Sequence, residues 1–284
     1  MNKNVKILMA LMSLVIISLM SCKKEKDNPE VVNAIIAKWE ITDPNSPYTC
    51  FEFTKDSNYI VIRRNEVAVD GNKTLKSNAN SKSSWLMSAA NAQAKASKAL
   101  PESNLSPVHF GKYKIDGDKI ILSGFGVINV IKITKEEFAF SFKLESTGDE
   151  WNYVANKVEN LISSSSKTDM LCRTWVLDKV TLSIDESELT ELEKTFLLMI
   201  KALLEGSTVV FSQAGTYLVM YPMGFAGLAE WKWANKEETA FYFSWDNWES
   251  SDIALINKLT STSLEIKEET EEGYYSISKL SISK

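Results

Sequence analysis

The chain contains two copies of one short pattern, Phe53-Thr54-Lys55-Asp56-Ser57-Asn58-Tyr59 and Phe211-Ser212-Gln213-Ala214-Gly215-Thr216-Tyr217. In each copy, residues that favour turns lie between two aromatic residues. A strand, a tight turn and a second strand bring two such aromatic side chains into contact across a hairpin. The pattern therefore predicts one hairpin in each half of the chain.

The repeat extends beyond the hairpin in both directions. Trp39 precedes the first copy and Trp175 precedes the second. Downstream, Gly111-Lys112-Tyr113-Lys114 resembles Glu230-Trp231-Lys232-Trp233, and Thr134-Lys135-Glu136-Glu137-Phe138 corresponds to Thr260-Ser261-Thr262-Ser263-Leu264. Four matches in the same order indicate an internal duplication, because self-similarity of this kind is the sequence signature of repeated structural units.

Short segments that alternate apolar and polar residues follow in each half. They are residues 119–123, 127–133, 138–143 and 151–154 in the first half, and 239–245, 253–259, 264–268 and 274–282 in the second. Such segments between polar turns predict an all-β fold of two tandem antiparallel barrels or sandwiches. We expect the domains at residues 33–156 and 171–284, with a linker at residues 157–170.

One inserted helix is expected in each domain. Apolar residues recur at helical spacing over residues 85–99 and again over residues 189–203. Ser187 is the expected N-cap of the second helix, and Gly206 is its expected C-terminal stop. Each helix either covers a barrel mouth or a sheet, or forms a lid over a ligand cavity, and the sequence leaves both interpretations open.

The opening tryptophan, the aromatic hairpin, the later Gly-x-Tyr or Glu-Trp-x-Trp strand and the final meander together resemble the lipocalin-like domains of many secreted bacterial lipoproteins. The resemblance spans nearly all of residues 33–284 and implies two β-barrels. It also implies that Trp39 and Trp175 are structural residues that close the barrel floors. The first copy lacks the turn glycine and has a long segment after its hairpin, so we expect its barrel to be distorted or open.

Residues 1–21 have the layout of an export signal. Lys3 and Lys6 give a positive start, and the apolar run that follows is shorter than the about 20 residues that span a membrane. Leu19-Met20-Ser21-Cys22 resembles the lipobox of bacterial lipoproteins, which implies a lipoprotein signal peptide and acylation of Cys22, with palmitate among the attached chains.

Residues 22–32 are charged and contain proline, which predicts a flexible tether. Acidic residues soon after the cysteine are similar to surface-export signals of some Gram-negative lipoproteins. We therefore expect a lipid-anchored protein of the outer membrane of a Gram-negative bacterium, facing either the periplasm or the cell surface.

The charge of the chain argues against nucleic acid as a partner. The formal net charge of −5 becomes −7 once Lys3 and Lys6 are removed with the signal. Nucleic-acid binding requires clustered Lys and Arg, and Arg63-Arg64 alone does not form such a patch. Cys50 and Cys172 fall in different domains, so buried thiols are favoured over a disulfide, although pairing stays open.

Residues that serve catalysis and metal binding are scarce. His109 is the one histidine, and a surface or turn position is expected for it. The chain has no phosphate-loop, zinc-protease, hydrolase or Cys-x-x-Cys motif. An acidic cluster is interpreted as a solvated charge run at a hairpin turn, and it comprises Glu265, Glu268, Glu269, Glu271 and Glu272. We expect no catalytic residues, no metal and no cofactor.

Aromatic residues crowd one stretch of the second domain. Strand alternation places Phe241, Phe243 and Trp245 on one face, and Trp233 lies one segment earlier. The stripe is either core or the lining of a cavity, so these four residues are the candidate ligand-binding residues. The expected function is non-enzymatic binding of a small apolar or amphiphilic ligand in a barrel.

The alternative function belongs to another class. A structural or adaptor envelope lipoprotein would have packed barrels without a ligand and would act through protein contacts. Its contact patch would include Trp248 and the apolar, glycine-containing loop of residues 220–228. The protein partner is unknown.

Overall fold

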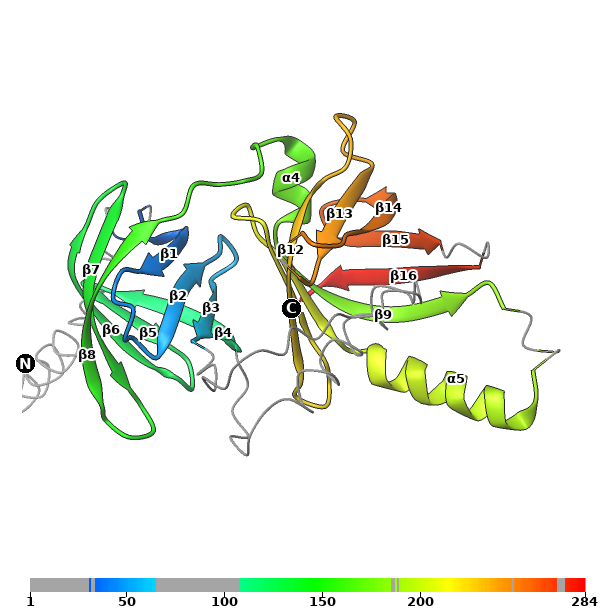
Figure 1. Ribbon diagram of the computed structural model, residues 1–284, viewed down its shortest axis with the longest axis horizontal. Helices are drawn as coiled ribbons and strands as arrows, with labels where there is room; N and C mark the ends of the chain where they lie inside the picture. Colours follow the sequence, from blue (N-terminus) through cyan, green and yellow to red (C-terminus); the bar gives the residue numbers. More distant parts are fainter. Residues whose placement is uncertain are drawn as a thin grey trace, which may run out of the picture.

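The computed structural model describes residues 31, 34–64, 108–184, 187, 189–246, 248–269 and 274–283. Its strands form two closed antiparallel barrels, one from each half of the chain (Figure 1). The predicted all-β fold with two tandem barrels is therefore confirmed. The helix expected over residues 85–99 lies outside the described residues.

Both barrels are simple meanders in which each strand pairs with the next and the last closes onto the first. The first barrel comprises β1 (Lys38–Ile41), β2 (Tyr48–Phe53), β3 (Asn58–Arg63), β4 (Val108–Asp116), β5 (Lys119–Leu122), β6 (Gly126–Ile133), β7 (Glu137–Leu144) and β8 (Glu150–Lys157). The second comprises β9 (Thr174–Leu182), β10 (Thr208–Phe211), β11 (Thr216–Met220), β12 (Ala226–Trp233), β13 (Ala240–Ser244), β14 (Asp252–Leu259), β15 (Ser263–Glu269) and β16 (Tyr275–Ile282).

The repeat seen in the sequence recurs in individual hydrogen bonds. The Nε1 of Trp39 donates to the carbonyl of Ile35 at 2.9 Å, and the Nε1 of Trp175 donates to the carbonyl of Leu171 at 3.0 Å. Both tryptophans are fully buried, each in the core of its own barrel. Each indole thus ties the segment before the first strand to the floor of its barrel.

The registers of the two barrels also match. A bulge interrupts the pairing of β6 with β7 between Val130 and Lys132, and the pairing of β14 with β15 shifts at the corresponding place, between Ile256 and Lys258. Asn58 pairs with Lys112, and Thr216, its counterpart in the second copy, pairs with Glu230. Lys112 therefore corresponds to Glu230, whereas the sequence comparison matched Gly111 with Glu230. The same inward-facing positions can therefore be compared between the barrels.

The expectation that the first barrel is distorted or open is wrong as to its closure. The first barrel is closed, because β3 pairs directly with β4 in spite of the long segment between them. Between the barrels, Ile162 is buried in the second core and Ser166–Leu171 form the short helix α4. Ser165 caps α4 by accepting a hydrogen bond from the backbone N–H of Thr168 at 2.9 Å.

The second inserted helix is present as α5 (Glu191–Leu204), but its ends and its buried face differ from the prediction. The backbone N–H of Lys194 bonds to the carbonyl of Thr190, so the helix begins after Thr190 rather than after Ser187. Gly206, at φ 87°, ends it as expected. Leu197 and Leu204 are buried. The spacing leaves Met199 and Ile200 as alternatives on the buried face; Ile200 packs against the core, whereas Met199 is exposed, as is Leu192 of the expected stripe. Apolar residues surround much of this helix, so spacing alone did not single out one stripe.

None of the helices among the described residues is long and apolar enough to cross a membrane.

Trp175→Ala should lower the free energy of unfolding of the second barrel by about 3–5 kcal/mol, because it opens a cavity in a closed core. Urea denaturation followed by circular dichroism measures the change. Ile131→Ala is the control, since that side chain is 66% exposed and its loss should cost less than about 0.5 kcal/mol. Equal effects of the two substitutions would show that Trp175 does not anchor the barrel.

Candidate functional site at the mouth of the second barrel

Two of the four candidate ligand-binding residues lie deep in the second core. Phe241 and Phe243 are each 1% exposed. The ring of Phe241 lies 5.3 Å from that of Phe211, and the ring of Phe243 lies 5.9 Å from that of Tyr217, measured between centroids. These aromatic contacts fill one half of the barrel.

The other two candidates lie at opposite ends of the barrel. The Nε1 of Trp233 donates to the hydroxyl of Thr168 in α4 at 2.9 Å, which places Trp233 at the floor. Trp245 follows β13 at the other end, with its ring 5.7 Å from that of Tyr217. We call this other end the mouth, because the connections β9–β10, β11–β12, β13–β14 and β15–β16 all lie there.

Polar side chains face the interior of the barrel at its mouth. In β15 the buried positions are Leu264, Ile266 and Glu268, so alternation turns Glu268 inward, where it is 6% exposed. In β16 the same alternation buries Ser276 and Ser278. The interpretation of Glu268 as part of a solvated charge run is therefore wrong, because its neighbours on the same face belong to the core.

Several polar atoms of this region are buried without a hydrogen-bond partner. They are the hydroxyls of Ser207, Ser276 and Ser278 and the Nε1 of Trp245. Buried polar groups of native proteins are nearly always hydrogen-bonded, so these four atoms are expected to have partners outside the protein chain. Water or a polar ligand can supply the missing bonds.

Two buried tyrosines of the second barrel show how strongly its interior is shielded from solvent. Burial raises the pKa of Tyr217 well above its usual value, and the nearby Glu268 carboxylate and Tyr221 raise it further. Burial alone raises the pKa of Tyr221. Both phenols therefore stay protonated, and the Glu268 carboxylate lies close enough to Tyr217 for their charges to interact.

The first barrel has aromatic rings at the corresponding positions. Trp151 pairs with Phe142 across β8 and β7, as Ser276 pairs with Glu268 across β16 and β15. Tyr153 of the first barrel likewise corresponds to Ser278 of the second, each lying two residues further along its strand.

Those rings pack tightly against one another. The ring of Phe142 lies 5.2 Å from that of Phe125 and 5.7 Å from that of Tyr48, and Tyr48 also contacts Trp151. At these matched positions the first barrel therefore has aromatic rings, whereas the second has a carboxylate and two hydroxyls.

The two barrels meet through corresponding strands. Ile60 of β3 lies with Leu218 of β11 and Val210 of β10 in a third apolar cluster, which is separate from the two barrel cores. These side chains point outward from their own barrels, since their neighbours in each strand point into a core. The barrels are thus docked through the outer faces of their sheets.

Buried polar contacts fix the relative position of the barrels. The hydroxyl of Thr216 donates to the carboxylate of Glu52 at 2.7 Å, and the Nδ2 of Asn58 donates to the hydroxyl of Thr174 at 2.6 Å. All four residues are buried. Asp56 accepts a hydrogen bond from the backbone N–H of Thr174 at 2.9 Å.

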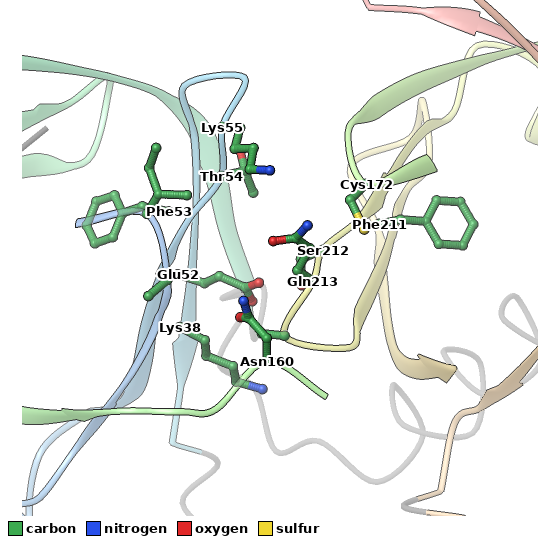
Figure 2. Close-up of a pocket in the computed structure, with 13 residues that line it drawn as sticks. Lys38, Glu52, Phe53, Thr54, Lys55, Asn160, Cys172, Phe211, Ser212 and Gln213 are labelled. Carbon is green, nitrogen blue, oxygen red and sulfur yellow. The ribbon is translucent and has the colours of Figure 1, made fainter. Parts of the chain in front are cut away.

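Two cavities lie along this junction. One of about 40 Å³ is lined by Glu52, Cys172 and Gln213, and Figure 2 shows the rings of Phe53 and Phe211 pointing away from it in opposite directions, each into its own barrel. This volume is enough for water molecules but not for a larger ligand.

The other cavity, of about 190 Å³, is lined by residues of both barrels. Lys38 and Ile62 come from the first barrel, and Glu230 and Trp245 are among those from the second. Of the four candidate ligand-binding residues, Trp245 is the one that borders this cavity.

The sequence also singled out His109, Cys50 and Cys172. His109 is a half-buried residue within β4, rather than a turn residue, and its ring stacks on Phe125 at 4.1 Å. Burial, together with Arg63, lowers its pKa. Cys50 and Cys172 are free thiols, and burial raises the pKa of Cys50 to about 12. Among the described residues, no group of His, Cys, Asp and Glu side chains is arranged to hold a metal ion.

Neither the models of known protein families nor the curated proteins include a match to this chain.

Asp56→Ala should destabilise the docking of the barrels by about 1–3 kcal/mol, because it leaves the backbone N–H of Thr174 without its acceptor. Burial acts to raise the pKa of Asp56, but hydrogen bonds from Thr174, Thr54 and Asn58 outweigh it and lower the pKa. The stability that this carboxylate contributes is therefore present above a pH of about 4 and is lost as the pH falls below it.

Thermal unfolding at a series of pH values measures this contribution. The wild type should lose stability in acid more steeply than Asp56→Ala, while the control Glu159→Ala, an exposed carboxylate, should follow the wild type. Parallel curves for the wild type and Asp56→Ala would contradict the assignment.

Proposed function

We propose that the protein is a non-enzymatic, lipid-anchored binding protein whose second barrel takes a small amphiphilic molecule at its mouth. The observation that carries this proposal is the exchange of Phe142, Trp151 and Tyr153 for Glu268, Ser276 and Ser278 at matched positions. Small barrels either fill with side chains or hold one small ligand, and the two halves of this chain represent the two cases.

The distribution of polar and apolar surface supports an amphiphile. The core of the second barrel is apolar and rich in aromatic rings, while the hydroxyls of Ser276 and Ser278 are buried in it without partners. Ligand sites are typically apolar with a few placed polar groups, as here. The packed first barrel then serves as a scaffold against which the second is docked.

Membrane attachment is the second part of the proposal. It is supported by the apolar run and by the lipobox-like Leu19-Met20-Ser21-Cys22, after which acylation would place the protein in the outer membrane. Two or more acyl chains give durable anchoring, whereas one chain binds only marginally.

Ser278→Tyr should abolish ligand binding, because it introduces at the mouth the ring that the first barrel has at the same position. Titration with the apolar fluorescent probe N-phenyl-1-naphthylamine should show affinity lower by at least about tenfold, a loss of about 1.4 kcal/mol. Ser278→Ala is the matched control, since it removes the hydroxyl without filling space. Undiminished probe binding by a folded Ser278→Tyr protein would place the ligand elsewhere.

Cys22→Ser should release the protein from the membrane. In the host, the substituted protein should appear in the soluble envelope fraction, whereas the wild type should incorporate radiolabelled palmitate and sediment with the outer membrane. Membrane association that persists after Cys22→Ser would refute anchoring through this residue.

An adaptor function is the second candidate, favoured by exposed apolar side chains beside the mouth. Of the expected loop of residues 220–228, residues 221–225 connect β11 to β12 and the rest belongs to these two strands. Met223 and Phe225 in the connection are exposed. Trp248 is less available than expected, since its indole N–H donates to the carboxylate of Glu230 and Lys232 lies over its ring at 3.9 Å.

A further inference from the structure

The wall of the second barrel groups three oxygen-bearing side chains on neighbouring strands. Glu268 and Ser276 are direct cross-strand partners, and both face inward. The Cβ atoms of such a pair lie about 4.5–5.5 Å apart, and a diagonal neighbour lies within about 7–8 Å. Ser278 is that diagonal neighbour, because it lies two residues beyond Ser276 on the same face.

The chemistry of these groups discriminates between kinds of ligand. A carboxylate accepts hydrogen bonds and carries negative charge, and a serine hydroxyl accepts as well as donates. An ammonium group has three donors and one positive charge, so the three side chains can satisfy it completely. A carboxylate head group would instead meet like charge at Glu268 in a dry environment, where such repulsion is strongest.

We propose that the mouth of the second barrel selects amphiphiles with an amine head group over those with a carboxylate head group. This inference rests on the proposed function, since it assumes that a ligand enters the mouth. The head group lies against Glu268, Ser276 and Ser278, and the alkyl chain lies among the apolar side chains of the barrel and of α5. Leu204 of α5 belongs to the core of this barrel, and Ile200 packs against that core, so α5 supplies part of the apolar surface.

Isothermal titration calorimetry with three ligands of equal chain length tests the selection. The protein carries Cys22→Ser, so that no acyl chain competes, and is titrated with dodecylamine, dodecanol and dodecanoate below their micellar concentrations. Dodecylamine should bind at least about tenfold more tightly than dodecanoate, with dodecanol between them.

Glu268→Gln identifies the group responsible. This variant should bind dodecylamine about tenfold more weakly while its affinity for dodecanol changes less than about twofold. Glu265→Gln is the matched control, because Glu265 lies on the same strand outside the core and should leave all three affinities unchanged. Ser276→Ala, which removes one acceptor, should weaken dodecylamine binding several-fold and serves if Glu268→Gln fails to fold.

The outcomes separate the two proposals. Equal affinities for the three ligands, or tighter binding of dodecanoate, overturn the amine selection and leave binding at the mouth intact. Dodecylamine affinity that Glu268→Gln and Ser276→Ala both leave unchanged also overturns the selection. Failure of all three ligands to bind overturns the proposed function itself.

Discussion

Closure of each sheet onto itself is the constraint on which the rest of this structure depends. In a closed antiparallel barrel, every second side chain of each strand has only the interior to occupy. The bulge after Val130 recurs after Ile256, so the same set of positions faces inward in both copies. The side chains at some of those positions differ: the first barrel has aromatic rings where the second has a carboxylate and two hydroxyls. The fold is therefore shared, and the candidate site of the second barrel rests on a few differences in side chains on it.

Much of the fold could be predicted from the sequence, because local patterns determine it. The paired aromatic hairpins and the alternating segments predicted the strands to within a few residues, and Trp39 and Trp175 marked the start of each unit. Closure of the first barrel was not foreseen, since the long segment before β4 suggested distortion. Closure requires only that β3 and β4 pair, and a connection of any length permits that.

The site was harder to recognise, because a dense acidic cluster near a turn is usually solvated. The signal was nevertheless present: Leu264, Ile266 and Glu268 alternate on one face, and the first two belong to the core. Docking of the barrels had a signal too. Tyr59-Ile60-Val61-Ile62 and Tyr217-Leu218-Val219-Met220 are continuous apolar runs, which are typical of strands buried on both faces. Such a run indicates that both faces of the strand are buried. It does not identify the segment that packs against the outer face.

At the mouth of the second barrel, buried hydrogen-bonding side chains thus take the positions that aromatic side chains occupy in the first barrel. A crystal structure of the protein purified from its host tests this account most directly. The account predicts electron density for a bound molecule or ordered water within hydrogen-bonding distance of Ser276 and Ser278, and none at the ring of Trp151 in the first barrel. A second barrel filled by its own side chains, with those hydroxyls bonded to protein groups, would contradict it.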